Sequence, residues 1–229
     1  MTNSQNFFAI DAAVSEKYPG FKAGVLVMQA IENVKSHPEI EKLKAQVVSD
    51  IREKYKGFTR DDLNKLPVIE AYNKYYKQFD KSYHVKAQVD SVINGKNLPG
   101  ISALLDAMFM NELKHMLLTA GHDLDSLKLP VVMKVADGSE GYVAMNNSEK
   151  KVYQNDLYMK DSESIISSIQ NGPDSRTKIT PTTKNALFAT YVPAEIGKEI
   201  VLSHLKDIQT AILIFSPNAK TPLLECFEA

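Results

Sequence analysis

Residues 101–121 read ISALLDAMFMNELKHMLLTAG, a long and strongly apolar segment that anchors the predicted fold. Its apolar residues recur at helical spacing and can line one helix face; they include Leu104, Leu105, Met108, Met116 and Leu117. Few positions are polar, so the pattern predicts a helix that is buried on most sides. Asp106 lies inside this run, and a buried carboxylate needs partners or stays protonated.

The sequence before this segment predicts mainly helices. The expected elements are a short strand running into a short helix at 7–18, a buried strand at 20–31, and helices at 36–57, 66–80 and 85–95. The helix at 36–57 carries a candidate capping box, Ser36 with Glu39. The helix at 66–80 carries an aromatic stripe that includes Tyr72 and Tyr75. Such a stripe can stack bases, but this spacing favours a core role.

The sequence after residue 127 predicts mainly strands. The expected elements are two strands within 129–145 joined around Asp137-Gly138, strands at 162–170 and 185–193, a helix at 194–208 and a last strand at 210–217. A helix-rich half, 1–127, thus precedes a strand-rich half, 128–229. This order predicts an α+β fold, a mixed sheet with packed helices, in one continuous domain over 1–229.

Composition excludes several classes of function. Apolar residues make up 44% and charged residues 24% of the 229, and the net charge is −1, so no global basic field marks a dedicated nucleic-acid binder. Cys226 is the one cysteine, which excludes a disulfide framework. We find no signal peptide, membrane span or nucleotide-binding motif, and expect a cytoplasmic protein without cofactor, DNA or membrane partner.

Two short motifs could carry chemistry near the apolar segment. AGHDLDSL, residues 120–127, places His122 beside Asp123, and a histidine among acids can act as a general base or a ligand. The alternative is an acidic helix exit with a surface histidine. Glu112 and His115 lie at i and i+3, as in carboxylate-bridged metal bundles, but no second such pair exists and we expect no metal.

NGPDSRTKITPTT, residues 171–183, reads as a polar loop. Its candidate ligand-binding residues are Asn171, Asp174, Ser175, Arg176, Thr177 and Thr183. The Arg176 guanidinium offers five donors, and the hydroxyls can orient a water or a polar ligand. The alternative is an ordinary hairpin connection. We expect Arg176 to be a solvated loop arginine that carries little stability, so that Arg176→Ala should damage ligand binding while leaving the fold intact.

Four segments in this order resemble the tRNA-editing domain of the bacterial phenylalanyl-tRNA synthetase beta subunit, and still more its free-standing relatives. They are NLPGISALLDAMFM, AGHDLDSL, VVMKVADGSEGYVAM and NGPDSRTKITPTTKNALFATYVP, within about 67–206. The resemblance implies a pocket where the long helix meets the sheet. It also implies hydrolysis of a mischarged aminoacyl-tRNA ester in trans, or simply tRNA binding.

The chain departs from the family pattern at three polar positions. Met108 and Phe109 stand in the region of the family's asparagine, Ala120 at its histidine, and Ala189 at its glutamate. Either His122 and the loop at 171–177 substitute for these groups, or the pocket binds without hydrolysing. The apolar replacements should make the pocket less suited to tyrosine.

These observations lead to a working hypothesis about roles. His122 is the candidate base, oriented by Asp123. The candidate substrate contacts are Asp106, Asn171, Asp174, Ser175, Arg176, Thr177 and Thr183, with Asp174 on an amino group and Arg176 on a phosphate of the tRNA 3′ end. The rivals are a non-catalytic tRNA-binding module and a pocket reused for a free amino acid or a related metabolite. The sequence predicts no oligomeric state.

Overall fold

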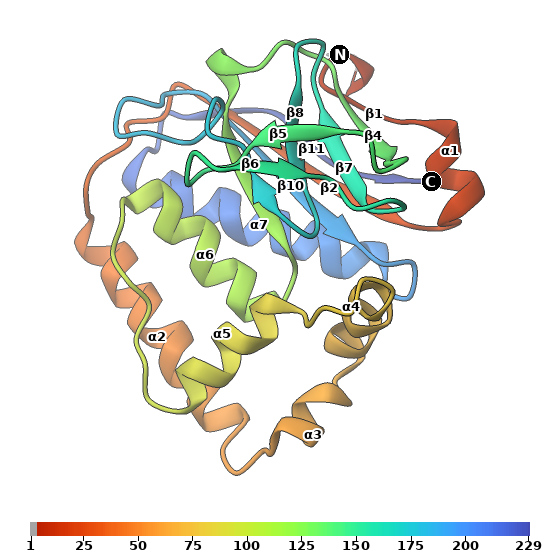
Figure 1. Cartoon of the computed structure of the whole chain (residues 1–229). Helices are drawn as coiled ribbons and strands as arrows, with labels where there is room; N and C mark the ends of the chain where they lie inside the picture. Colours follow the sequence, from red (N-terminus) through yellow and green to blue (C-terminus); the bar gives the residue numbers. More distant parts are fainter. Residues whose placement is uncertain (1–3) are drawn as a thin grey trace.

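In the computed structural model, which describes residues 4–229, the β-sheets lie on one side of the molecule and several helices lie together on the other (Figure 1). The helices are α1 Ala12–Lys17, α2 Pro38–Lys54, α3 Arg60–Asn64, α4 Pro67–Lys77, α5 His84–Ile93, α6 Ala103–His115 and α7 Lys198–Phe215. Short 3-10 turns cover Ser4–Asn6 and Leu124–Ser126. No helix among these residues is long and apolar enough to cross a membrane.

A four-stranded antiparallel sheet forms the centre of the fold. Its order is β11 Lys220–Glu228, β2 Lys22–Gln29, β10 Ala186–Val192 and β3 Thr119–Asp123. Two of these strands come from the helix-rich half of the sequence and two from the strand-rich half. The sheet therefore joins the two halves.

A second, mixed sheet packs against the first. Its order is β1 Phe8–Ile10, β4 Val131–Val135, β7 Leu157–Lys160, β8 Ile165–Ser168 and β9 Gly172–Pro173. β1 runs parallel to β4, and the other pairs are antiparallel. A separate hairpin pairs β5 Gly141–Val143 with β6 Glu149–Lys151. The predicted α+β fold, a mixed sheet with packed helices, is confirmed.

Strand β2 shows why its sequence is apolar without alternation. Val25 and Val27 belong to a core cluster shared with α4 and the mixed sheet, whereas Leu26 and Met28 belong to a second cluster shared with α6 and α7. Both faces of the strand are thus buried, so an apolar side chain on either face is removed from water. The aromatic stripe of α4 also lies in the core, since Tyr72 and Tyr75 are buried.

Helix α6 is shorter than the sequence predicts. The Ser102 side chain caps its first turn, accepting from the Leu105 N–H, and the helix ends at His115, followed by Met116 with a left-handed φ of 57°. Residues 119–123, which were expected to lie in or just after the helix, instead form β3 and pair with β10. The helix therefore runs directly into the sheet.

The C-terminal prediction is wrong in two elements. Residues 210–217 were expected to form a strand, but α7 continues to Phe215, and the real last strand, β11, was missed. Ile208, Ala211 and Ile212 are buried at helical spacing, because this face of α7 packs on the central sheet. A short apolar run is compatible with either structure, and the sheet behind it decides.

Two local predictions also need correction. The capping box of Ser36 and Glu39 does not form: α2 begins at Pro38, and His37 stands at its N-cap without a side-chain cap bond. The two strands around Asp137-Gly138 exist, and Gly138 has a positive φ of 93°, but they do not pair with each other. β4 pairs with β7, and β5 pairs with β6.

Candidate functional site

A cavity of about 450 Å³ lies between α6, β3 and the segment from β8 to residue 179. Its apolar walls come from Leu105, Met108 and Phe109 of α6 and from Ile179. At Ala120 and Gly121, β3 supplies almost no side chain, which leaves the space open. A Cβ added at Gly121 would approach the Ile179 Cδ1 to 2.8 Å and the Met108 Sδ to 3.0 Å, so glycine keeps these walls close.

Glu112 is the one acidic side chain that lines this cavity. It lies one helical turn after Met108, on the same face of α6, and is only 3% exposed. Its Oε1 accepts a 2.9 Å hydrogen bond from the Thr119 N–H, where β3 begins. Burial raises the pKa of Glu112 to about 8, although this hydrogen bond opposes the shift. The carboxyl is therefore mostly protonated at neutral pH and presents a neutral polar group.

Hydroxyl groups line the opposite side of the cavity. The Ser167 Oγ and the Tyr191 Oη lie 2.7 Å apart, and Ser168 lies beside them on β8. Burial raises the pKa of Tyr191 well above its usual value, so the phenol stays neutral. The interior of the cavity thus combines apolar walls with uncharged hydrogen-bonding groups, an arrangement common in ligand sites.

Lys178 and His84 lie among the lining residues as well. The Lys178 side chain is exposed, and within residues 4–229 it makes no ion pair or side-chain hydrogen bond. It is the only lysine or arginine of the lining, so it places one uncompensated positive charge there. His84 is the first residue of α5.

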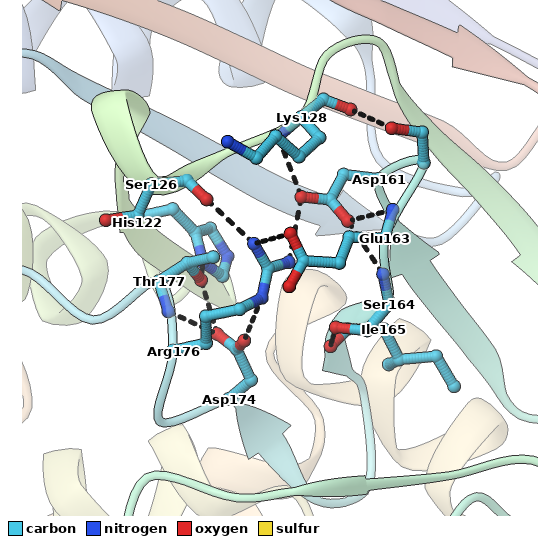
Figure 2. Close-up of polar contacts among 11 residues, drawn as sticks. His122, Ser126, Lys128, Asp161, Glu163, Ser164, Ile165, Asp174, Arg176 and Thr177 are labelled. Carbon is cyan, nitrogen blue, oxygen red and sulfur yellow. Dashed lines mark hydrogen bonds and ion pairs between the residues drawn. The ribbon is translucent and has the colours of Figure 1, made fainter.

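Three of the six residues singled out from the 171–183 loop, Asp174, Arg176 and Thr177, lie in what we call the Arg176 network. The network consists of His122, Ser126, Asp161, Glu163, Asp174, Arg176 and Thr177 (Figure 2). The His122 Nδ1 is 2.7 Å from the Thr177 Oγ1, and that hydroxyl in turn donates to Asp174. His122, Asp174 and Thr177 are all buried. The structure therefore brings four of the predicted site residues together, and three of them, all but Arg176, are buried.

Arg176 is bound from several sides within this network. Its guanidinium donates 2.7 Å to the Ser126 carbonyl and 2.8 Å to the Asp161 carboxylate, and Glu163 lies 3.6 Å away (Figure 2). The Asp161 side chain is fully buried. Burial alone would raise the pKa of Asp161, but hydrogen bonds from backbone N–H groups and Arg176 hold it below the usual value. Arg176 is thus a partner of a buried carboxylate and not a solvated loop arginine.

The same environment keeps His122 neutral. Burial, together with the neighbouring Arg176 cation, lowers the pKa of His122 to about 3. Its side chain has no exposure to solvent and does not line the cavity. The geometry therefore gives His122 a supporting position behind the cavity, next to Gly121 on β3.

The remaining predicted residues occupy four further places. The Thr183 hydroxyl donates to the Asp123 carboxylate at 2.6 Å, which fixes the turn after β3. Asp106 pairs with the buried Lys44 at 2.8 Å and accepts from the Ile101 N–H. The Asn171 amide donates to the Lys151 carbonyl.

The last of the predicted residues, Ser175, joins the β5 edge through its backbone N–H, which donates to the Val143 carbonyl. None of the nine predicted residues lines the cavity, and their catalytic and binding roles stay predictions. No sequence motif pointed to the lining residues His84 and Lys178, and Glu112 was considered only as a metal ligand paired with His115. For Glu112 a signal existed, because it follows Met108 on the same helix face.

No metal centre is found in the part of the chain that the structure describes. No group of three or more metal-ligating side chains is placed to hold an ion there. Glu112 and His115, which share helix α6, turn to different partners. Glu112 binds the Thr119 N–H, whereas the His115 Nε2 lies 2.7 Å from the Asp207 carboxylate.

Comparison with known proteins places this cavity in a family. The model of the B3/4 domain matches residues 71–205, more than half of the chain, and this range contains every residue that lines the cavity. The chain belongs to the B3/4 domain family. In this B3/4 protein the matched range runs from α4 into α7 and includes the whole Arg176 network.

Among solved structures, the B3/4 protein is similar to an N-terminal fragment of the phenylalanyl-tRNA synthetase beta subunit from Pyrococcus horikoshii. The match has a TM-score of 0.50 and 12% sequence identity, and covers 94% of this chain and 50% of that one. The chain thus spans about half the length of the fragment. No curated protein matches. The predicted relationship to the synthetase beta subunit is confirmed at the level of family and fold.

Proposed function

We propose that this B3/4 protein binds the aminoacylated 3′ end of a tRNA and hydrolyses a mischarged ester in trans. The observation that carries the proposal is the cavity, which lies wholly within the matched domain. In this proposal the amino-acid side chain enters the cavity, and the ester lies at its mouth. A protein with this substrate works where translation takes place, so we place it in the cytoplasm.

The size and lining of the cavity support an amino-acid side chain as its occupant. A volume of about 450 Å³ lies within the usual range of small-molecule sites. The apolar walls at Met108, Phe109 and Ile179 favour an apolar side chain, because its burial removes apolar surface from water. An ionised side chain would lose its hydration among these walls without gaining a buried countercharge.

The charge among the lining residues supports a polyanionic partner. Lys178 is exposed and unpaired within residues 4–229, so it is available to a phosphate of the tRNA end.

The need for a second, hydrolytic site also has a chemical reason. A synthetase discriminates by only about 10- to 200-fold between side chains that differ by one methylene.

A deacylation assay over a panel of mischarged tRNAs tests the proposal. The sharpest pair is a leucyl and an aspartyl ester on the same tRNA, because the two side chains have similar size and differ in charge. We expect the leucyl ester to be hydrolysed at least tenfold faster than in buffer, and the aspartyl ester at the buffer rate. Hydrolysis of no ester above the buffer rate would sink the enzymatic proposal.

The rival proposal, binding without hydrolysis, also has a specific observation in its favour. At the positions where the family resemblance expects a histidine and a glutamate, Ala120 and Ala189 pair with each other across β3 and β10. Glu112 is protonated at neutral pH and is not a base there. Salt-dependent tRNA binding without deacylation would support a binding module. Calorimetric binding of a free amino acid, with no affinity for tRNA, would support a metabolite pocket.

A further inference from the structure

His84 lies at the cavity in a hydrogen-bonded arrangement that defines its tautomer. It begins helix α5 and lines the cavity beside α6. Its Nδ1 is 3.2 Å from the Tyr76 Oη, and the Tyr76 Oη is 3.2 Å from the Ile169 carbonyl oxygen. Tyr76 itself is buried, so this chain of contacts holds one edge of the imidazole ring against the protein.

The proton count in this chain of contacts has one solution. A carbonyl oxygen carries no proton, so Tyr76 must donate its single hydroxyl proton to Ile169. The His84 Nδ1 must then donate to the Tyr76 Oη. A neutral imidazole carries one N–H, and therefore its Nε2 holds an unshared electron pair.

The surroundings favour this neutral form. His84 stands in the first turn of α5, where the positive end of the helix dipole disfavours an imidazolium. The rings of Tyr76 and Tyr83 pack edge-on against the imidazole, with centroids 6.1 and 5.9 Å away, and no carboxylate of residues 4–229 pairs with it. His84 is exposed to solvent on one side, and its partial desolvation against the protein lowers its pKa. The ring is thus neutral at neutral pH and ready to accept a proton.

The other titratable side chains of the cavity cannot take this role. Glu112 is protonated at neutral pH, and burial raises the pKa of the Tyr191 phenol well above its usual value. Lys178 is the positively charged side chain of the lining and offers no base. His122 is fully buried, and its Nδ1 is engaged by Thr177. Among the lining residues, His84 is therefore the one side chain that offers a nitrogen base.

We propose that the His84 Nε2 is the general base of ester hydrolysis at this cavity. The assignment rests on the function proposed above. The Nε2 takes a proton from a water molecule as the water oxygen attacks the ester carbonyl carbon. The bond between that carbon and the ribose oxygen then breaks, and the imidazolium returns the proton to the ribose oxygen. The products are a free amino acid and a tRNA with its terminal hydroxyl restored, and the base is regenerated.

The test compares wild type with His84→Gln on the mischarged tRNA that wild type hydrolyses fastest. We expect kcat to fall by about 10² to 10⁴-fold, the usual contribution of a general base. The affinity for an amide-linked, non-hydrolysable aminoacyl-tRNA should change less than threefold. His37→Gln is the matched control, because His37 precedes α2, does not line the cavity and should keep the wild-type kcat.

The pH–rate profile of wild type provides a second test that needs no variant. A neutral base predicts that kcat rises with pH through a pKa below 6.5 and is level above it; a flat profile from pH 5 to 7.5 overturns the assignment. If wild type hydrolyses an ester and His84→Gln has the same kcat, the assignment of His84 as the base is overturned. The enzymatic function is not. Absence of wild-type hydrolysis on every ester overturns both this assignment and the enzymatic function.

Discussion

The cavity and the Arg176 network lie side by side along β3, but they differ in whether their charged side chains have partners within the chain. Ala120 and Gly121 line the cavity, and the next residue, His122, enters the network. In the network, the charged groups are matched by partners from the same chain (Figure 2). In the cavity, Lys178 and the neutral Glu112 lack an opposite charge. Charged residues that are matched by internal partners support the fold, and those without an opposite charge are available to a ligand.

The largest expected effect is on the network. Arg176→Ala leaves the buried Asp161 carboxylate without its countercharge, and we expect the free energy of unfolding to fall by about 4 kcal/mol. Arg60→Ala is the matched control, because the Arg60 side chain is 82% exposed, and should cost less than about 1 kcal/mol. Denaturant unfolding measures both. Equal losses in the two variants would erase the distinction between network and surface.

The second prediction concerns the buried acid of the cavity. The folded pKa of Glu112 is about 8, above the ordinary glutamate value of 4.5, so the folded state holds a proton that the unfolded state releases. Its contribution to stability is present below pH 4.5 and is lost as pH rises to about 8. Glu112→Gln should therefore gain about 3 kcal/mol over wild type at pH 8 and little at pH 5.

The control for this pH dependence is Glu16→Gln, on the exposed surface of α1. Its difference from wild type should not change between pH 5 and pH 8. The measurement is chemical denaturation at both pH values. If Glu112→Gln has the same free energy of unfolding as wild type at both pH values, the carboxyl is ionised in the folded protein and the cavity has a charged interior.

The third prediction fills the cavity without touching the network. Ala120→Leu places three more carbons among the apolar walls, and we expect the affinity for an aminoacyl-tRNA analogue to fall about tenfold, or about 1.4 kcal/mol. Stability should change by less than about 1.5 kcal/mol, because the cavity has room. Ala13→Leu, exposed on α1, should bind as wild type does. Unchanged affinity in Ala120→Leu would place the ligand elsewhere.

The smallest expected effect comes from removing Lys178, the one lysine that lines the cavity. Lys178→Ala should reduce the slope of log affinity against log salt by about 0.7, the value for one contact to single-stranded nucleic acid. Stability should not change, since Lys178 is exposed and unpaired within residues 4–229. Lys35→Ala, on the exposed segment before α2, should keep the wild-type slope. An unaltered slope in both variants would remove Lys178 from the tRNA contact.

Elements with a long and unambiguous pattern could be predicted from the sequence. The apolar helix α6, the doubly buried strand β2 and the aromatic core face of α4 all follow from periodicity and composition. The C-terminal part of α7 could not, because TAILIF suits a strand or a helix equally. Strand β11 could not either, since much of its length is only partly buried and lacks a clear alternation.

By itself, the sequence determined the α+β class and the family, because both rest on residue order along the chain. Only the tertiary structure decided which polar residues are available to a ligand. Arg176 finds its partners in Ser126, 50 residues away, and Asp161, 15 residues away, and no local pattern encodes such pairings. Glu112 and His84 stand at the cavity for the same reason, because the burial and bonding of a polar group depend on elements that meet only after folding.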